Sequence, residues 1–201
     1  DRQGCPDHDG DGWSNEGDPF PTDPTQYSDL DGDGFGDNSS GMKPDACPST
    51  FGESSRDRYG CPDRDFDGWS DAVDAFPDDS SQWADRDGDG YGDSANGLTP
   101  DGCPDEVGNS TEDRFGCPDS DGDGWSDAGD ALPAEPTQWS DRDGDGWGDD
   151  ESGNLNDTFP LDSTQWADRD GDGFGDNEFG NNGDACPDVW GISTVDRNGC
   201  P

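Results

Sequence analysis

Basic and apolar residues are both scarce in this chain. Its 201 residues include 10 lysines and arginines against 52 aspartates and glutamates, which gives a formal net charge of -42, and only 24% are hydrophobic. So few apolar residues cannot build an ordinary hydrophobic core. The negative charge argues against nucleic acids and anionic membranes as partners, because either polyanion would be repelled. Multivalent cations are the favoured partners, and without them we expect a largely unfolded chain.

Helices, membrane spans and zinc sites also find no support in the sequence. No apolar run approaches the roughly 18 to 20 residues of a transmembrane helix, and no stretch has the apolar periodicity of a helix. The chain has no Cys-x-x-Cys pair and one histidine, His8, so zinc ligation and a catalytic thiol are both disfavoured. The fold class that we predict is therefore irregular, with little regular helix or sheet.

The chain does contain one motif in seven copies. Asp-x-Asp-x-Asp-Gly, followed by Trp, Phe or Tyr, begins at Asp7, Asp29, Asp63, Asp85, Asp119, Asp141 and Asp168. A hard cation such as Ca²⁺ takes six to eight oxygen ligands. Acids at alternate positions of a tight loop bring three carboxylates to one point, while glycine permits the turn. We call each copy an acidic loop, number it from its first aspartate, and predict that it binds calcium.

The predicted ligands occupy the same positions in every acidic loop. They are the carboxylates at positions 1, 3 and 5, the backbone carbonyl of the aromatic residue at position 7, an acid or amide at position 9, and a closing acid. By loop, they are Asp7, Asp9, Asp11, Trp13, Asn15 and Asp18; Asp29, Asp31, Asp33, Phe35, Asp37 and Asp45; Asp63, Asp65, Asp67, Trp69, Asp71 and Asp74; Asp85, Asp87, Asp89, Tyr91, Asp93 and Asp101; Asp119, Asp121, Asp123, Trp125, Asp127 and Asp130; Asp141, Asp143, Asp145, Trp147, Asp149 and Asp157; Asp168, Asp170, Asp172, Phe174, Asp176 and Asp184.

The closing acid divides the repeats into two kinds. It stands at position 12 in three short repeats and at position 17 in four long ones, and a random acidic tract would not keep that register. An EF-hand or a dockerin uses a similar loop but needs a helix after position 12. Here that stretch reads Asp-Pro-Phe-Pro at 18–21 and Asp-Ala-Leu-Pro at 130–133. Proline removes a backbone donor and clashes with the preceding turn, so these helices are excluded.

The acidic loops belong to a larger internal repeat. Asp-Arg-x-Gly-Cys-Pro recurs at 1–6, 57–62, 113–118 and 196–201. We therefore expect one continuous elongated array over 1–201, with sub-blocks 1–56, 57–112, 113–195 and the start of another at 196–201, cut from a longer chain. Because the first and last copies of the motif are in phase, we also expect that copies could continue head to tail in a fibre.

The repeats resemble thrombospondin type 3 repeats over essentially the whole chain. The matching elements are Asp-x-Asp-x-Asp-Gly-x-x-Asp, the following Asp-x-Cys-Pro, and a glutamine three residues before the next acidic loop, as at Gln82. The resemblance implies an extracellular array with almost no helix or sheet, in which calcium replaces the hydrophobic core. It gives the ligand roles to Asp63, Asp65, Asp67 and the carbonyl of Trp69, and to their equivalents. Repeats that end in Phe-Pro or Leu-Pro depart from the family pattern.

All seven cysteines precede proline, and six of them form pairs 14 residues apart. This constant spacing favours disulfides between Cys47 and Cys61, Cys103 and Cys117, and Cys186 and Cys200, over alternative links of 42, 42 and 69 residues. Cys5 is then left over. Disulfides favour an extracellular or cell-surface location. Sequons at Asn38, Asn109 and Asn156 could carry N-glycans.

These features favour a rigid, calcium-loaded rod that serves as an extracellular stalk, spacer or fibril. The alternative is a calcium-dependent adhesion module that binds glycans, mineral or a partner protein. An enzyme is disfavoured because every candidate acid is already assigned to metal. Seven divalent ions would offset only a third of the net charge, so we expect more than seven calcium ions. The aromatic rings are expected to pack on prolines and glycines at the joints between repeats.

Overall fold

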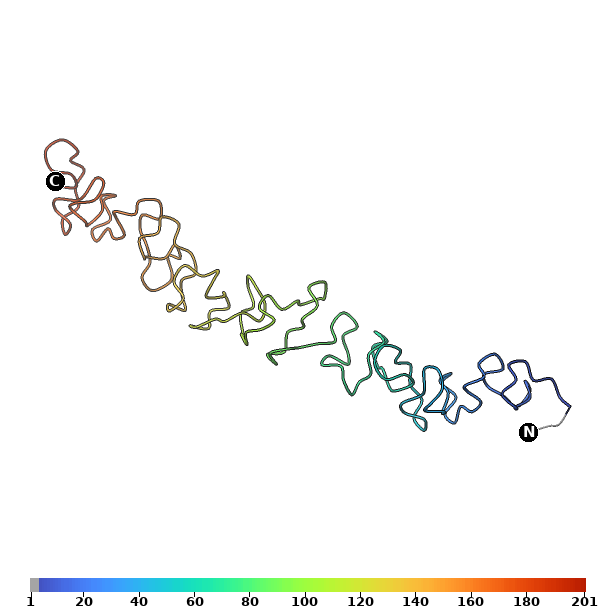
Figure 1. Ribbon diagram of the computed structural model, residues 1–201. Helices are drawn as coiled ribbons and strands as arrows, with labels where there is room; N and C mark the ends of the chain where they lie inside the picture. Colours follow the sequence, from blue (N-terminus) through green and yellow to red (C-terminus); the bar gives the residue numbers. More distant parts are fainter. Residues whose placement is uncertain (1–3) are drawn as a thin grey trace. The chain divides into compact units, whose positions relative to one another are not determined.

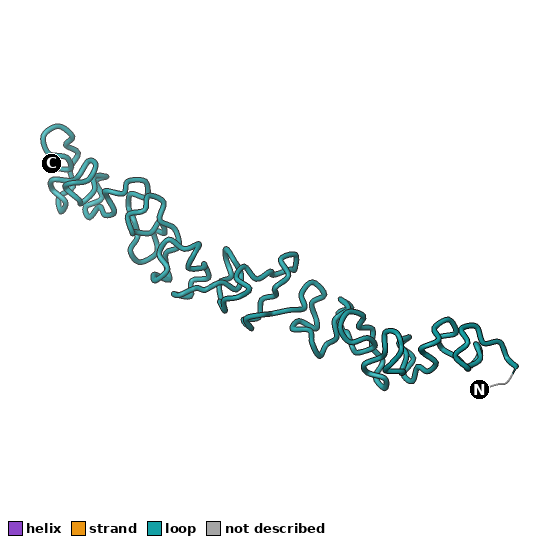
Figure 2. Tube along the Cα trace, in the orientation of Figure 1, coloured by secondary structure: helices purple, strands orange, loops and turns teal. Residues whose placement is uncertain are grey.

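The computed structural model describes residues 4–201, and within them the chain forms neither an α-helix nor a β-strand. Figure 2 shows the described chain as loops and turns throughout. Backbone pairing of the sheet type is limited to four isolated parallel bridges, Gly36 with Pro44, Gly92 with Pro100, Gly148 with Asn156 and Gly175 with Gly183. The predicted irregular fold is confirmed. None of the described residues lies in a helix that could cross a membrane.

The chain divides into two compact units. Unit 1 is Asp1–Arg86 with Gly90–Pro100, and unit 2 is Asp87–Asp89 with Asp101–Pro201. In Figure 1, unit 1 falls in the blue to green part of the chain and unit 2 in the green to red part. Each unit contains both short and long repeats.

Polar side chains fill the interior of both units. The buried hydrophobic residues in the described chain are three cysteines, Cys61, Cys117 and Cys200. The other buried side chains belong to serine, glutamine and aspartate, whereas Leu98 and Phe179 are almost fully exposed. Apolar burial therefore contributes little to stability. The fold depends on hydrogen bonds, on disulfides and on positive charge that neutralises the buried aspartates.

A buried glutamine organises each long repeat. The Nε2 of Gln138 donates to the carbonyls of Asp150 at 2.8 Å and Asn154 at 2.9 Å, and its Oε1 accepts from the Asp150 N–H at 2.9 Å. A Cβ added at Gly148 or Gly153 would come within 2.0 or 2.5 Å of the Gln138 amide, so both positions exclude a side chain. The equivalent buried residues are Gln26, Gln82 and Gln165.

We expect Gln138→Ala to lower the free energy of unfolding by about 3 kcal/mol, because two carbonyls and one N–H would lose a buried partner. Chemical denaturation of the full chain measures this loss. Glu151→Ala is the matched control, since Glu151 is exposed in the same repeat. A loss below about 1 kcal/mol would show that water replaces the glutamine at little cost.

Aromatic rings stack on one another between successive repeats. The position-7 ring of Trp125 stacks on Trp139 with centroids 6.3 Å apart, and Trp147 stacks on Trp166 at 6.0 Å, with interplanar angles of 3° and 6°. In unit 1, Trp13 stacks on Tyr27 at 5.7 Å. The sequence predicted packing on proline and glycine, whereas the structure shows that these rings pack in pairs. Such pairs contribute roughly 0.5–1.5 kcal/mol beyond the area that they bury.

Three disulfides close loops of equal length. They join Cys47 to Cys61, Cys103 to Cys117, and Cys186 to Cys200, each with a sequence separation of 14. These are the pairs that the constant spacing favours. Cys5 is exposed and has no disulfide partner among the described residues.

Candidate metal centres

Backbone N–H groups hold the carboxylates of each acidic loop in place. In one acidic loop, the two carboxylate oxygens of Asp119 accept from the N–H groups of Gly122 at 2.7 Å and Gly124 at 3.0 Å. Asp121 accepts from the N–H of Asp123 at 3.2 Å. Gly122 and Gly124 have φ angles of +83° and +102°, a region that favours glycine. The chain therefore curls around its own acids.

This curl brings the three alternating acids together. Groups with one carboxylate oxygen from each acid, all within 4.8 Å of one another, include Asp7, Asp9 and Asp11; Asp29, Asp31 and Asp33; Asp63, Asp65 and Asp67; and Asp119, Asp121 and Asp123. The loops that begin at Asp141 and Asp168 have the same hydrogen bonds from the N–H groups at positions 4 and 6. The loop that begins at Asp85 is divided between the two units.

Many of these acids keep one buried oxygen that accepts no hydrogen bond from the described residues. The unpartnered oxygens all lie at position 3, at position 5 or on a closing acid. They are the Oδ2 atoms of Asp9, Asp11, Asp31, Asp45, Asp65, Asp67, Asp74, Asp87, Asp121, Asp123, Asp143, Asp145, Asp157, Asp170 and Asp184, together with the Oδ1 atom of Asp143. A buried anionic oxygen without a partner is strongly unfavourable. Oxygens in this arrangement fit a bound cation.

The closing acids are buried and face the acids of their own loop. Asp157 is 2% exposed, and one of its oxygens accepts from the N–H of Phe159 at 2.7 Å. Burial raises the pKa of the Asp157 carboxyl, and the charges of Asp145, Asp143 and Asp149 raise it further. In the short repeats, burial and the acids of its own loop likewise raise the pKa of Asp74. Closing acids of both kinds therefore add a buried carboxylate to the acidic cluster.

Position 7 offers a neutral oxygen to the same site. Within the described part of the chain, its carbonyl accepts no hydrogen bond in six loops, those of Trp13, Phe35, Trp69, Trp125, Trp147 and Phe174. The N–H of the same residue is already committed, since that of Trp125 donates to Asp123 at 2.8 Å. The carbonyl is thus available as the backbone ligand that a calcium loop uses at this position.

The residue at position 9 accepts a hydrogen bond from the start of its own acidic loop. Asn15 accepts from the N–H of His8 at 2.8 Å, and Asp127 accepts from the N–H of Ser120 at 2.7 Å, so position 9 bonds to position 2. In three loops with arginine at position 2, the guanidinium also pairs with this acid, at 3.7 Å between Arg64 and Asp71, 3.8 Å between Arg86 and Asp93, and 3.9 Å between Arg169 and Asp176. Metal ligation by position 9 stays a prediction, because the structure gives these side chains a hydrogen-bonding role of their own.

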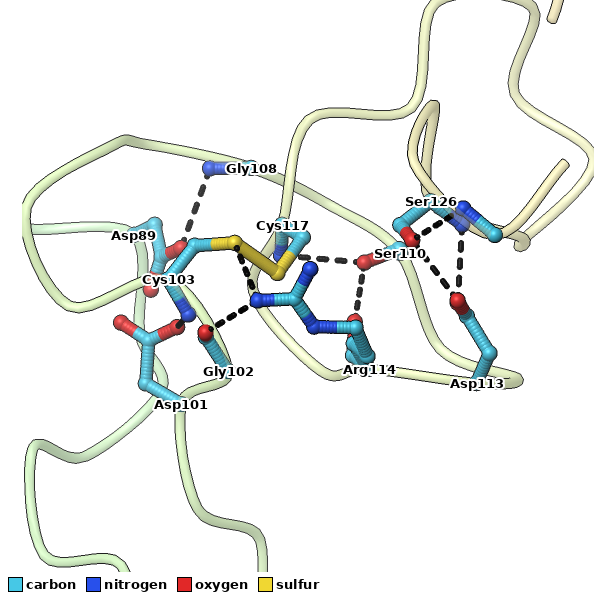
Figure 3. Close-up of a disulfide and its surroundings, with 11 residues drawn as sticks. Asp89, Asp101, Gly102, Cys103, Gly108, Ser110, Asp113, Arg114, Cys117 and Ser126 are labelled. Atoms are coloured by element: carbon cyan, nitrogen blue, oxygen red, sulfur yellow. Dashed lines mark hydrogen bonds between the residues drawn. A yellow bond between two sulfur atoms is a disulfide. The ribbon is translucent and has the colours of Figure 1, made fainter.

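Each disulfide loop is hydrogen-bonded to the acidic loop before it, as Figure 3 shows for Cys103 and Cys117. The N–H of Gly108 donates to Asp89 at position 5 over 3.0 Å, and the N–H of Cys103 donates to the closing acid Asp101 over 2.7 Å. Arg114 donates to the sulfur of Cys103 at 3.4 Å. The other two disulfide loops make the equivalent bond. The N–H of Gly52 donates to Asp33, and the N–H of Gly191 donates to Asp172. Sequence reasoning missed this link, although glycine stands five residues after the first cysteine in all three loops.

The three sequons are tied into the fold. Asn38 donates through its Nδ2 to the carbonyl of Thr25 at 2.8 Å, and Asn156 forms a bridge with Gly148. Asn109 is exposed, but the hydroxyl of the next residue, Ser110, is buried and donates to the carbonyl of Arg114. Glycosylation remains a prediction from the sequence.

A comparison of the chain with known protein families finds no match, and a comparison with curated proteins finds none either. The resemblance to thrombospondin type 3 repeats therefore rests on the motifs of the chain itself.

Proposed function

We propose that this chain is a calcium-binding structural protein built as a thrombospondin type 3-like array, in which ions take the place of a hydrophobic core. The observation that carries the proposal is the repeated set of buried, unpartnered carboxylate oxygens at position 3, position 5 and the closing acid. A protein that buried these charges without a counter-ion would lose far more stability than its hydrogen bonds supply.

The donor set favours calcium over other metals. All the candidate ligands are oxygens, from carboxylates and a backbone carbonyl, which suits a hard cation. Their irregular loops can supply the six to eight ligands of Ca²⁺, whereas Mg²⁺ demands a near-ideal octahedron. The three disulfides suggest a secreted or oxidising environment. Outside the cell, affinities of about 0.1–1 mM are sufficient.

The mechanical role follows from the repeat. The acidic loops recur with the same internal bonds from the N–H groups at positions 4 and 6. We propose a rod, stalk or fibril that holds an extended shape when calcium is bound. In an array of this kind the loss of one ion should loosen its own repeat and the neighbouring repeats, and leave distant ones intact.

We expect more than seven calcium ions per chain, because the acidic loops and their closing acids together leave more buried negative charge than one divalent ion per loop can neutralise. Metal analysis after equilibrium dialysis measures the ratio. Asp121→Asn should lower it by about one ion, while Glu151→Gln, the same charge change at an exposed site, should leave it unchanged. A ratio of seven or below in the unmodified protein would contradict the proposed count.

An adhesion function has one observation in its favour. Trp147, Trp166, Arg169 and Asp176 line an open groove of about 340 Å³ in unit 2, where aromatic rings lie beside hydrogen-bonding charged groups. Trp69, Trp83, Arg86 and Asp93 line a similar groove of about 470 Å³ in unit 1. Calcium-dependent binding on a glycan array that is lost with the tryptophans would favour this alternative over a purely mechanical role.

A further inference from the structure

One acidic loop carries a bulky residue where the other six carry glycine. At position 4 the six glycines have φ angles between +75° and +84°, and Phe66 has a φ of +64° in the seventh loop. This left-handed region is unfavourable for a residue with a bulky side chain. The loop itself needs only the backbone there, since the N–H of Phe66 donates to Asp63 at 2.8 Å as glycine does elsewhere. The strain therefore points to a use for the ring outside the loop.

The ring of Phe66 lies in a surface groove. Phe66 is 71% exposed and Phe51 is 56% exposed. Both line one open groove of about 400 Å³ in unit 1, together with Glu53, Pro62 and Arg64 among others. Two large apolar rings thus face solvent in one groove, Phe66 from its acidic loop and Phe51 from the disulfide loop between Cys47 and Cys61.

The rim of this groove is acidic. Its one basic residue, Arg64, is already paired, with Asp78 at 3.1 Å and with Asp71 at 3.7 Å. Glu53 has no ion-pair partner among the described residues. The groove therefore joins apolar rings to uncompensated negative charge on a chain whose net charge is -42. A second copy of the chain would be repelled, whereas a basic partner would be attracted.

The chain's own cations already lie on aromatic rings in the same unit. The guanidinium of Arg56 lies over Trp83 at 5.7 Å from the ring centroid, and the ammonium of Lys43 lies over Tyr59 at 5.8 Å. Attraction between a cation and the face of a ring accounts for both contacts. No such contact is made by Phe51 or Phe66 within the described residues.

We propose that the groove formed by Phe51 and Phe66 binds a basic segment of a partner protein, in which an arginine or lysine side chain packs on the phenyl rings beside Glu53. Nearby apolar side chains of that segment would cover the remaining ring surface. Phe66 then replaces glycine because the groove needs its ring, at the expense of backbone strain in its own loop. The groove borders the acidic loop that begins at Asp63, since Asp63 and Asp71 also line it, but neither phenyl ring is among the candidate metal ligands.

A binding experiment on the full chain tests this proposal. The probe is a fluorescein-labelled peptide of alternating arginine and leucine, followed by fluorescence anisotropy in millimolar calcium. Phe66→Gly and Phe51→Ser leave the net charge unchanged, so non-specific attraction to the acidic surface stays the same in every variant. We expect each to weaken binding by about tenfold or more. Phe179→Ala removes an exposed ring elsewhere, and its binding should stay within about twofold of the unmodified chain.

Stability separates a binding role from a structural one. Because six loops have glycine at this position, Phe66→Gly should leave the unfolding midpoint unchanged or raise it. A lower midpoint would mean that the ring supports the fold, and would overturn the proposal. Equal peptide binding by the unmodified chain and all three variants would mean that charge attraction alone binds the peptide. That result would also overturn the proposal. So would undiminished binding of a peptide with glutamine in place of arginine.

Discussion

When EDTA removes the divalent cations, we expect both units to lose their fold and the chain to expand. The interior holds buried carboxylates and three buried cysteines in place of a hydrophobic core, so the metal-free state has little to offset the repulsion among its acids. Two measurements follow the change. The radius of gyration from X-ray scattering should rise, and the near-ultraviolet circular dichroism of stacked pairs such as Trp125 with Trp139 should disappear.

Sodium chloride distinguishes ligation from simple screening. At about 1 M ionic strength the Debye length falls to about 3 Å, so salt would relieve repulsion between exposed acids without filling the loops. We therefore expect salt to compact the metal-free chain only in part and not to restore the dichroism of the tryptophans, whereas calcium should restore both. If EDTA leaves the radius and the spectrum unchanged, ions are not what holds this fold.

The acidic loops were predictable because their three carboxylates and their glycines lie within six consecutive residues. Spacing places Asp119, Asp121 and Asp123 on one tight turn, and the structure brings their oxygens together. The equal separation of cysteine pairs is also a property of the sequence itself. The absence of helix and strand in residues 4–201 follows from the proline three residues after each closing acid and from the lack of apolar periodicity.

Contacts between more distant residues could not be predicted in this way. Gln138 was noticed as part of a motif, yet its bonds to Asp150 and Asn154 depend on how the long repeat turns back on itself. The bond from Gly108 to Asp89 joins two loops 19 residues apart. Position 9 was assigned to the metal because calcium loops use it, but a side chain that can bind an ion can equally accept an N–H.

The disulfides and the candidate metal centres are coupled in three of the seven acidic loops. In these loops the position-5 acids, Asp33, Asp89 and Asp172, each accept an N–H from a glycine of the disulfide loop that follows. The position-5 acids of the other loops, such as Asp67 and Asp123, keep an unpartnered oxygen among the described residues. The same kind of site thus occurs with and without a disulfide loop docked on it, which gives an internal comparison within one chain.

We expect removal of one disulfide, by Cys103→Ser together with Cys117→Ser, to weaken calcium binding at the coupled site and to leave most of the others unchanged. A loop of this length contributes about 3 kcal/mol by constraining the unfolded chain, which sets an upper limit of roughly 100-fold on the loss of affinity. Calcium titration calorimetry should then become biphasic, with a minor weak class of sites. Cys5→Ser is the control, because Cys5 is exposed and outside any disulfide.

A second substitution separates the contact from the covalent link. An added Cβ at Gly108 would lie 2.0 Å from the carbonyl carbon of Cys117, so Gly108→Ala must shift the backbone whose N–H donates to Asp89, while both cysteines remain. If docking on Asp89 transmits the effect, this variant should show the same weak class of sites with its disulfide intact. If the cysteine variant binds calcium as tightly as the unmodified chain at every site, the disulfide loops do not stabilise the metal centres, and their bond to position 5 is only a consequence of chain packing.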